Sequence, residues 1–132
     1  MPDWSPDGRR IAYYVLNCIG VVDTNGTNDR RLLTAKGGSV GGPAFSPDGS
    51  KIAFGATIDG KGGLYAIDTN GRSLRRLAKN ASLPSWSPDG REIVFVGHGE
   101  VEPSAGFDGL LYVMYADGSG RRQLTFGPGP SP

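Results

Sequence analysis

One five-residue phrase occurs three times in this chain at a constant spacing. It is found at Trp4–Gly8, at Phe45–Gly49 and at Trp86–Gly90, so that successive copies lie 41 residues apart. Each copy leads into a segment rich in Ile, Val, Ala and aromatic residues. A constant period in the forties indicates a repeat architecture, in which each unit buries its apolar faces against its neighbours.

The shared part of the phrase, Ser-Pro-Asp-Gly, has the composition of a tight turn. Pro presets φ at the first turn position, Asp accepts hydrogen bonds from the backbone ahead of it, and Gly adopts the positive φ that closes the turn. We therefore predict a structural role for the Asp and Gly of each copy. These residues are Asp7, Gly8, Asp48, Gly49, Asp89 and Gly90.

A second turn signal follows the first in every unit. It is Asn25-Gly26 in the first unit, Asn70-Gly71 in the second and Asp117-Gly118 in the third. These dipeptides favour two-residue β-hairpins because both central residues need a positive φ. Two hairpins in each unit predict four strands in each unit.

The strands are predicted from short apolar runs between these turns. The first strands are expected at 2–4, 43–45 and 84–86, the second at 10–14, 51–55 and 92–96, and the third at 19–22, 64–67 and 110–114. The fourth strands open with arginine pairs at 30–31, 75–76 and 121–122. No segment has a helical apolar stripe.

These observations predict an all-β protein of the β-propeller class with three four-stranded antiparallel blades. The blades are expected at about 2–34, 43–78 and 84–126 in a single domain covering 1–132, with a Gly/Pro tail at 127–132. The aromatic residues that open the three phrases are expected in equivalent inter-blade packing positions. They are Trp4, Phe45 and Trp86.

Charge and hydropathy exclude several classes of partner. The chain has 14 basic and 13 acidic side chains, so its net charge of +1 predicts no nucleic-acid partner. No apolar run approaches the ~20 residues of a membrane span. The first repeat starts at once and we expect no signal peptide; the chain is cytoplasmic as written, and the sequence leaves the native compartment open. The single cysteine, Cys18, lies in an apolar run and is expected to be a buried small hydrophobe.

The loops opposite the Ser-Pro-Asp-Gly turns differ between units in length and sequence. They are predicted at 35–42, 55–63, 79–83 and 97–109, and we expect any function to lie on this variable rim. A ligand or ion site is predicted there at His98, Glu100, Glu102 and Asp108. A single imidazole is fewer nitrogen ligands than catalytic metal sites usually have, so a solvated loop is the favoured interpretation and no metal or cofactor is predicted.

Two further motifs have a structural and a functional interpretation. Gly37–Gly41 matches the nucleophile-elbow pattern, but it lies in a predicted inter-blade connection and the only histidine, His98, is in another loop. We therefore predict no catalytic residues. The arginine pairs of the fourth strands either contact an acidic partner or, as we favour, prevent edge-to-edge pairing of outer strands.

With its Ser-Pro-Asp-Gly turns followed by Ile11-Ala12-Tyr13, Ile52-Ala53-Phe54 and Ile93-Val94-Phe95, the chain resembles the TolB-like propellers. The same repeat occurs in the propeller domains of prolyl-oligopeptidase and tricorn-type proteases. The resemblance covers nearly the whole chain. It implies a six-bladed ring of four-stranded blades, often used for protein binding, of which three blades are present here.

Three hypotheses about function follow. The first is a non-enzymatic scaffold that binds a protein or peptide on the variable rim and forms a homodimer of two times three blades, because only six lies within the usual range of about four to eight blades. The second is a metal-assisted hydrolase or lyase built on the central channel. The third is an inactive fragment of a longer propeller protein.

Overall fold

The computed structural model describes residues 2–97 and 109–126, and these contain strands and turns but no helix. The strands form three separate four-stranded sheets. Within each sheet, every strand pairs antiparallel with its neighbour in sequence. The predicted fold class is therefore confirmed: the chain is all-β and has three four-stranded antiparallel blades.

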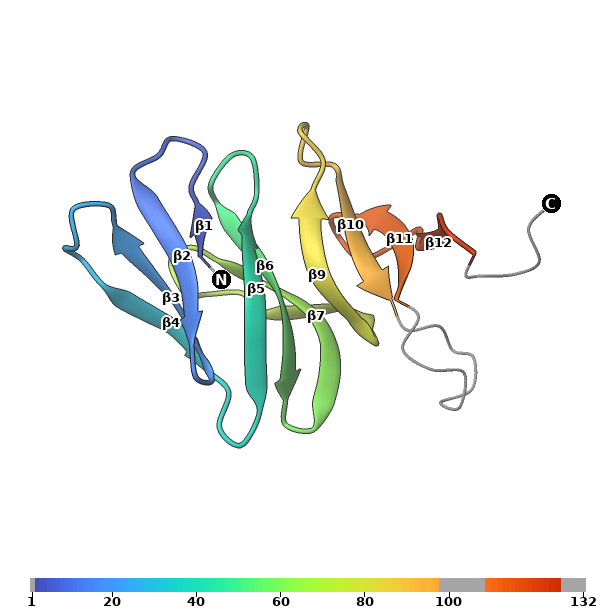
Figure 1. The fold of residues 1–132 in the computed structure, drawn as a ribbon, viewed down its shortest axis with the longest axis horizontal. Coiled ribbons are helices and arrows are strands. Elements are labelled where there is room, and N and C mark those ends of the chain that lie inside the picture. Colours follow the sequence, from blue (N-terminus) through green and yellow to red (C-terminus); the bar gives the residue numbers. More distant parts are fainter. Residues whose placement is uncertain (1, 98–108, 127–132) are drawn as a thin grey trace.

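The strands of each blade follow one another along the chain (Figure 1). The first blade contains β1 (Asp3–Trp4), β2 (Arg10–Val15), β3 (Cys18–Asp23) and β4 (Arg30–Thr34). The second contains β5 (Ser39–Phe45), β6 (Lys51–Ile58), β7 (Lys61–Asp68) and β8 (Arg75–Lys79). The third contains β9 (Ala81–Trp86), β10 (Glu92–Gly97), β11 (Leu110–Tyr115) and β12 (Arg122–Gln123).

The second and third blades begin earlier than the predicted positions 43 and 84. Strand β5 starts at Ser39 and β9 at Ala81 because each continues through its proline at a bulge. Gly42 and Pro43 together lie opposite one residue of β6, between the pairs Gly41↔Gly55 and Ala44↔Ala53. A bulge accommodates proline because it removes the need for an N–H in the ladder.

The connections on the predicted variable rim are shorter than expected. Strands β6 and β7 are joined by Asp59 and Gly60 alone, whose φ values of 51° and 76° are those of a type I′ hairpin. A single residue, Asn80 with φ 49°, separates β8 from β9. The predicted loops 55–63 and 79–83 are therefore mostly strand. The corresponding loop of the third blade falls largely on 98–108, outside the described residues.

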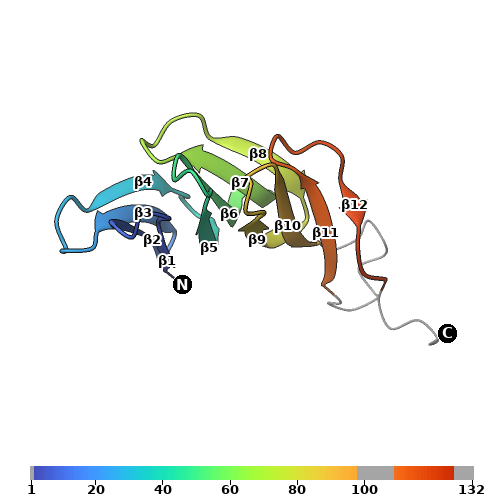
Figure 2. The ribbon, with the colours of Figure 1, turned by 90° about the horizontal axis from the view of Figure 1, so that it is seen from above.

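The three blades lie side by side along an arc (Figure 2). The first strand of each blade, β1, β5 and β9, lies on the concave side, and the fourth strands β4, β8 and β12 lie on the convex side. Strand β5 contacts β2 of the blade before it, and β9 contacts β5 and β6. This arrangement is that of consecutive blades in a propeller.

Apolar side chains fill the space between consecutive blades. Between the first and second blades, Ile19, Ile52 and Phe54 are fully buried. Between the second and third, the central residues are Leu64 and Phe95. In the second and third blades an aromatic pair is stacked across β6–β7 and β10–β11, with ring centroids 6.1 and 5.7 Å apart. The cores therefore lie between the sheets.

The first blade replaces this aromatic pair with Tyr13 and Gly20. A Cβ on Gly20 would lie 2.5 Å from the Tyr13 ring, so the absence of a side chain at position 20 makes room for that ring. The Tyr13 hydroxyl donates a hydrogen bond to Asp29. Burial, and then this bond to a carboxylate, raise the pKa of Tyr13 to about 12. Cys18 is buried nearby on β3.

The three aromatic residues that open the repeats are not equally packed. Phe45 is 7% exposed and lies in the core between the first and second blades, and Trp86 is half-buried against the core between the second and third. Trp4 is 63% exposed. Trp4 therefore has no inter-blade packing within the described residues, because no described strand lies on the outer side of the first blade.

Candidate functional site

The Ser-Pro-Asp-Gly turns form one rim of the arc and share one set of hydrogen bonds. In the second blade, the Asp48 carboxylate accepts hydrogen bonds from the Ser46 hydroxyl at 2.7 Å, and from the Ser50 amide and hydroxyl at 3.0 and 2.7 Å. The Ser46 hydroxyl oxygen accepts one from the Lys51 amide at 3.0 Å. The first and third blades repeat the bonds from serine and from the amide two residues ahead.

These bonds keep the turn carboxylates ionised. The Ser46 hydroxyl, followed by the amide and hydroxyl of Ser50, lowers the pKa of Asp48 to about 2. The equivalent serine and amide donors lower the pKa of Asp7 and of Asp89. Hydrogen bonds donated to a carboxylate favour its charged form. Each turn therefore contains an ionised aspartate at neutral pH.

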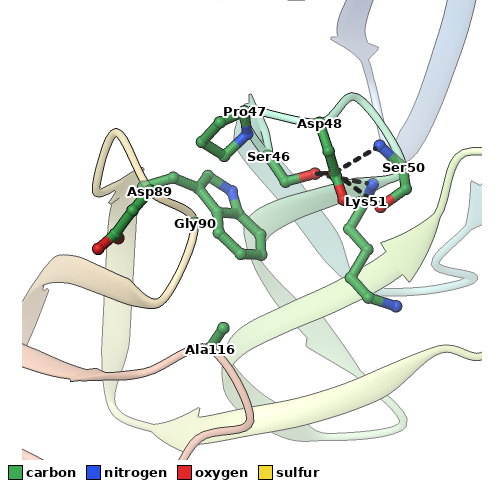
Figure 3. A pocket seen from close by; sticks show the side chains of 9 residues that line it. Ser46, Pro47, Asp48, Ser50, Lys51, Asp89, Gly90 and Ala116 are labelled. Atoms are coloured by element: carbon green, nitrogen blue, oxygen red, sulfur yellow. Dashed lines mark hydrogen bonds between the residues drawn. The ribbon is translucent and has the colours of Figure 1, made fainter.

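A cavity of about 380 Å³ lies on this rim between the second and third blades (Figure 3). Its walls come from the two turns, from the end of β9 and from the start of β6, together with one residue of the β11–β12 turn. The lining residues are Ser46, Pro47, Asp48, Ser50, Lys51, Trp86, Asp89, Gly90 and Ala116. The Trp86 indole N–H donates to the Ala44 carbonyl at 3.0 Å, which fixes the ring. The cavity thus has an aromatic wall and is bordered by the turns of Asp48 and Asp89, with the Asp89 carboxylate pointing away from Lys51 and Ala116 (Figure 3).

The Lys51 side chain extends away from Asp89 and Gly90 (Figure 3). Its ammonium group forms an ion pair with Asp68 on β7 at 2.7 Å. This bond is the main reason that the pKa of Asp68 is lowered. The one cationic side chain in the cavity lining, that of Lys51, is thus paired with Asp68 on its own blade.

A second cavity, of about 560 Å³, lies on the opposite side of the blades, near the ends of β6 and the starts of β5, β7 and β9. Glycines and small hydroxyl residues dominate its lining, and no charged residue lines it. Gly55 allows close packing here, because a Cβ on it would lie 3.4 Å from that of Ser82. The cavity is therefore uncharged and bounded largely by backbone.

The predicted ligand residues His98, Glu100, Glu102 and Asp108 all lie outside the described residues. Within 2–97 and 109–126, no group of three or more His, Cys, Asp or Glu side chains is placed to hold a metal ion. The same residues include no helix long and apolar enough to cross a membrane. Of the nucleophile-elbow match, Ser39 to Gly41 belong to strand β5, so the match does not form the strand–turn–helix that an elbow needs.

In the third blade, the predicted alignment of the arginine pair with those of the other blades is wrong by one residue. Arg122, not Arg121, is the counterpart of Arg30 and Arg75, because these three pair with Val113, Val21 and Ala66. Arg121 instead lies over the Tyr112 ring at 4.4 Å and donates to the Lys79 carbonyl at 3.1 Å. It therefore links the third blade to the second.

The cavity beside Trp86 was missed by reasoning from the sequence, which placed function on the opposite rim. One signal was present. The residue two positions after the turn glycine is Arg10 in the first repeat, Lys51 in the second and Glu92 in the third, so the repeats differ in charge at a position beside the turn. A difference of this kind between otherwise matching turns indicates that the rim is not uniform.

Comparison with known proteins finds relatives that share more than a third of their residues with this chain over the matched length. The chain is 35% identical over 115 residues to the uncharacterized peptidase YuxL of Bacillus subtilis strain 168, covering 75% of this chain and 18% of that protein. It is 37% identical over 109 residues to the Tol-Pal system protein TolB of Anaeromyxobacter dehalogenans strain 2CP-C, covering 80% of this chain and 23% of that protein. The chain thus spans about a fifth of the length of these relatives.

Among solved structures, the putative TolB from Agrobacterium tumefaciens superimposes with a TM-score of 0.79 at 26% identity. The match covers 91% of this chain and 46% of that one. The family model of the TolB beta propeller domain matches residues 1–130. These matches agree with the three blades and their repeated turns. The chain therefore belongs to the TolB β-propeller family.

Proposed function

We propose that this chain is a non-enzymatic binding module that pairs with a second copy to complete a six-bladed ring. The observation that carries the proposal is the exposure of apolar side chains at the two ends of the arc. The equivalent positions are less exposed wherever one blade faces another.

The outer face of the third blade lacks a covering blade among the described residues. Leu111 precedes Tyr112 as Leu64 precedes Tyr65, yet Leu64 is fully buried and Leu111 is 40% exposed. Tyr115 on the same strand is 53% exposed. Exposed apolar surface of this extent favours association.

The outer face of the first blade shows the complementary set of positions. Trp4 is 63% exposed where its counterpart Phe45 is 7% exposed. Tyr13 is half-buried where its counterpart Phe54 is fully buried. The third blade of one copy therefore offers the first blade of another the same kind of face that the second blade offers the third. A two-fold axis would then close a ring of six.

Light scattering tests the pairing. We expect a mass of twice 13.9 kDa for the purified chain. Leu111→Glu should yield a folded monomer, because a charge would then be buried in the pairing face. Leu16→Glu is the matched control, since Leu16 is 88% exposed on the β2–β3 turn and should leave the mass unchanged. A folded wild-type monomer at micromolar concentration would refute the pairing.

The absence of enzymatic activity is tested separately. YuxL is described as a peptidase, but the chain matches 18% of it, so we do not extend peptidase activity to this chain. We expect no turnover in esterase, glycosidase and peptidase screens, because the described residues include no nucleophile–base pair. Reproducible turnover that is lost in Ser39→Ala or His98→Ala would contradict this proposal.

A further inference from the structure

The chain provides an internal comparison for the cavity beside Trp86, because the same place exists between the first and second blades. There the Arg10 guanidinium lies over the Phe45 ring, with its carbon 5.9 Å from the ring centroid. One of its nitrogens donates to the Gly49 carbonyl at 3.5 Å. A cation from the preceding blade thus fills the space between the ring and the turn glycine.

Between the second and third blades the equivalent residue does not fill that space. Lys51 occupies the position of Arg10 in the repeat, but its ammonium group pairs with Asp68 at 2.7 Å. A Cβ built on Gly49 would lie 3.9 Å from an Arg10 nitrogen, whereas one on Gly90 would have no Lys51 atom among its nearest neighbours. The place taken by a guanidinium in one blade pair is therefore open in the next.

The turn glycine and the aromatic residue are both more buried between the first and second blades than between the second and third. Gly49 is buried beneath Arg10, and Gly90 is only half-buried. Phe45 is 7% exposed, and Trp86 is half-buried. The open space is the cavity of about 380 Å³ described above.

The remaining lining determines which ligand fits. Asp48 and Asp89 line the cavity, and the hydrogen bonds of their turns keep both carboxylates ionised at neutral pH. An indole face attracts cations more strongly than a phenyl face does. Arginine is the cation that combines stacking on a ring with donation to several acceptors.

We propose that this cavity binds an arginine side chain of a partner protein. Its guanidinium lies over the Trp86 indole and donates to the carbonyl of Gly90, as Arg10 does over Phe45 and to Gly49. The statement that the arginine belongs to a partner protein rests on the proposed binding function. The preference of the cavity for a guanidinium does not, because it can be measured with an amino-acid probe whatever the mass of the chain.

The probe is Nα-acetyl-arginine amide, followed through the indole N–H resonance of Trp86 in the Trp4→Phe variant of the full chain. Trp86 is then the only tryptophan, since the chain has two. We expect saturable binding with a dissociation constant on the order of 1 mM, as befits one side chain in a partly open site. Nα-acetyl-citrulline amide has nearly the same shape without the charge and should bind at least tenfold more weakly.

Two variants at position 51 separate occupation of the cavity from charge. Lys51→Arg keeps the charge but supplies a guanidinium from within, as Arg10 does, so binding of the probe should weaken at least tenfold. Lys51→Met removes a positive charge from the cavity lining without supplying a guanidinium, so binding of the arginine probe should be strengthened. Equal binding of the arginine and citrulline probes, undiminished binding to Lys51→Arg, lost binding to Lys51→Met, or no binding to the wild-type cavity would each overturn the proposal.

Discussion

At the scale of single residues, the turn aspartate organises each repeat. Asp48 accepts three hydrogen bonds through one oxygen, from Ser46 and twice from Ser50. We expect Asp48→Ala to lower the free energy of unfolding by about 1 kcal/mol, near the lower end for bonds to a charged acceptor, because the carboxylate is exposed. Urea denaturation measures this change. An unaltered midpoint would show that the turn does not need these bonds.

The same residue predicts how stability depends on acid. The pKa of Asp48 is about 2 in the folded chain and 3.8 in the unfolded reference, so ionisation favours the folded state. This stabilisation is fully present above the unfolded pKa and is lost as the pH falls through the folded pKa. We expect thermal melting temperatures to fall between about pH 4 and pH 2. The fall should be shallower in Asp48→Asn, and an identical fall in both proteins would contradict this cause.

At the scale of strands, two adjacent glycines of β7 give a matched test of the sheet geometry. A Cβ on Gly63 would lie 2.1 Å from the Ala78 carbonyl oxygen of β8, whereas one on Gly62 would have its nearest contact at 3.5 Å. Gly63→Ala must displace backbone and should cost more than about 2 kcal/mol, as overpacking does. Gly62→Ala should be neutral or stabilising by about 0.5 kcal/mol. Denaturant midpoints of the two variants compare them directly, and equal midpoints would be inconsistent with this packing.

The elements predicted well from the sequence are those set by local interactions. The Ser-Pro-Asp-Gly turn closes through hydrogen bonds between residues two to five positions apart in the sequence. The presence of Ser46 and Asp48 is therefore enough to predict the turn. The predicted start of β5 at Pro43 is too late because a bulge accommodates this proline inside the strand, which begins at Ser39. The Asp59-Gly60 dipeptide is itself typical of a two-residue hairpin and indicates the β6–β7 turn that the predicted loop 55–63 omits.

The cavity beside Trp86 was not predictable in the same way. It exists because Lys51 pairs with Asp68, a residue 17 positions away on the next strand. Nothing local to Lys51 determines whether its side chain covers the neighbouring blade or turns to its own sheet. Tertiary contacts decide this, and the cavity follows from them.

At the scale of the whole molecule, Trp4 reports whether the arc is covered at its first blade. Phe45→Ala should cost about 3–5 kcal/mol, because Phe45 is a buried aromatic residue. Trp4→Ala should cost about 1 kcal/mol or less if the outer face of the first blade stays open, and an amount like that of Phe45→Ala if a second copy covers it. In the paired state we also expect the melting temperature to rise with protein concentration. A melting temperature independent of concentration, with a small cost for Trp4→Ala, would indicate an open arc.

The proline bulges of β5 and β9 affect whether strands of other chains can pair with the concave edges of these sheets. These two strands lie on the concave side, where their outer backbone groups are not covered by a further strand of their own sheets. A regular strand edge recruits other strands and seeds fibres, but Pro43 and Pro84 lack an N–H and interrupt that edge. Strand addition at these two edges is thereby discouraged, while stacking of one sheet face on another remains possible. The concave edges of β5 and β9 are thus protected against the strand addition that seeds fibres.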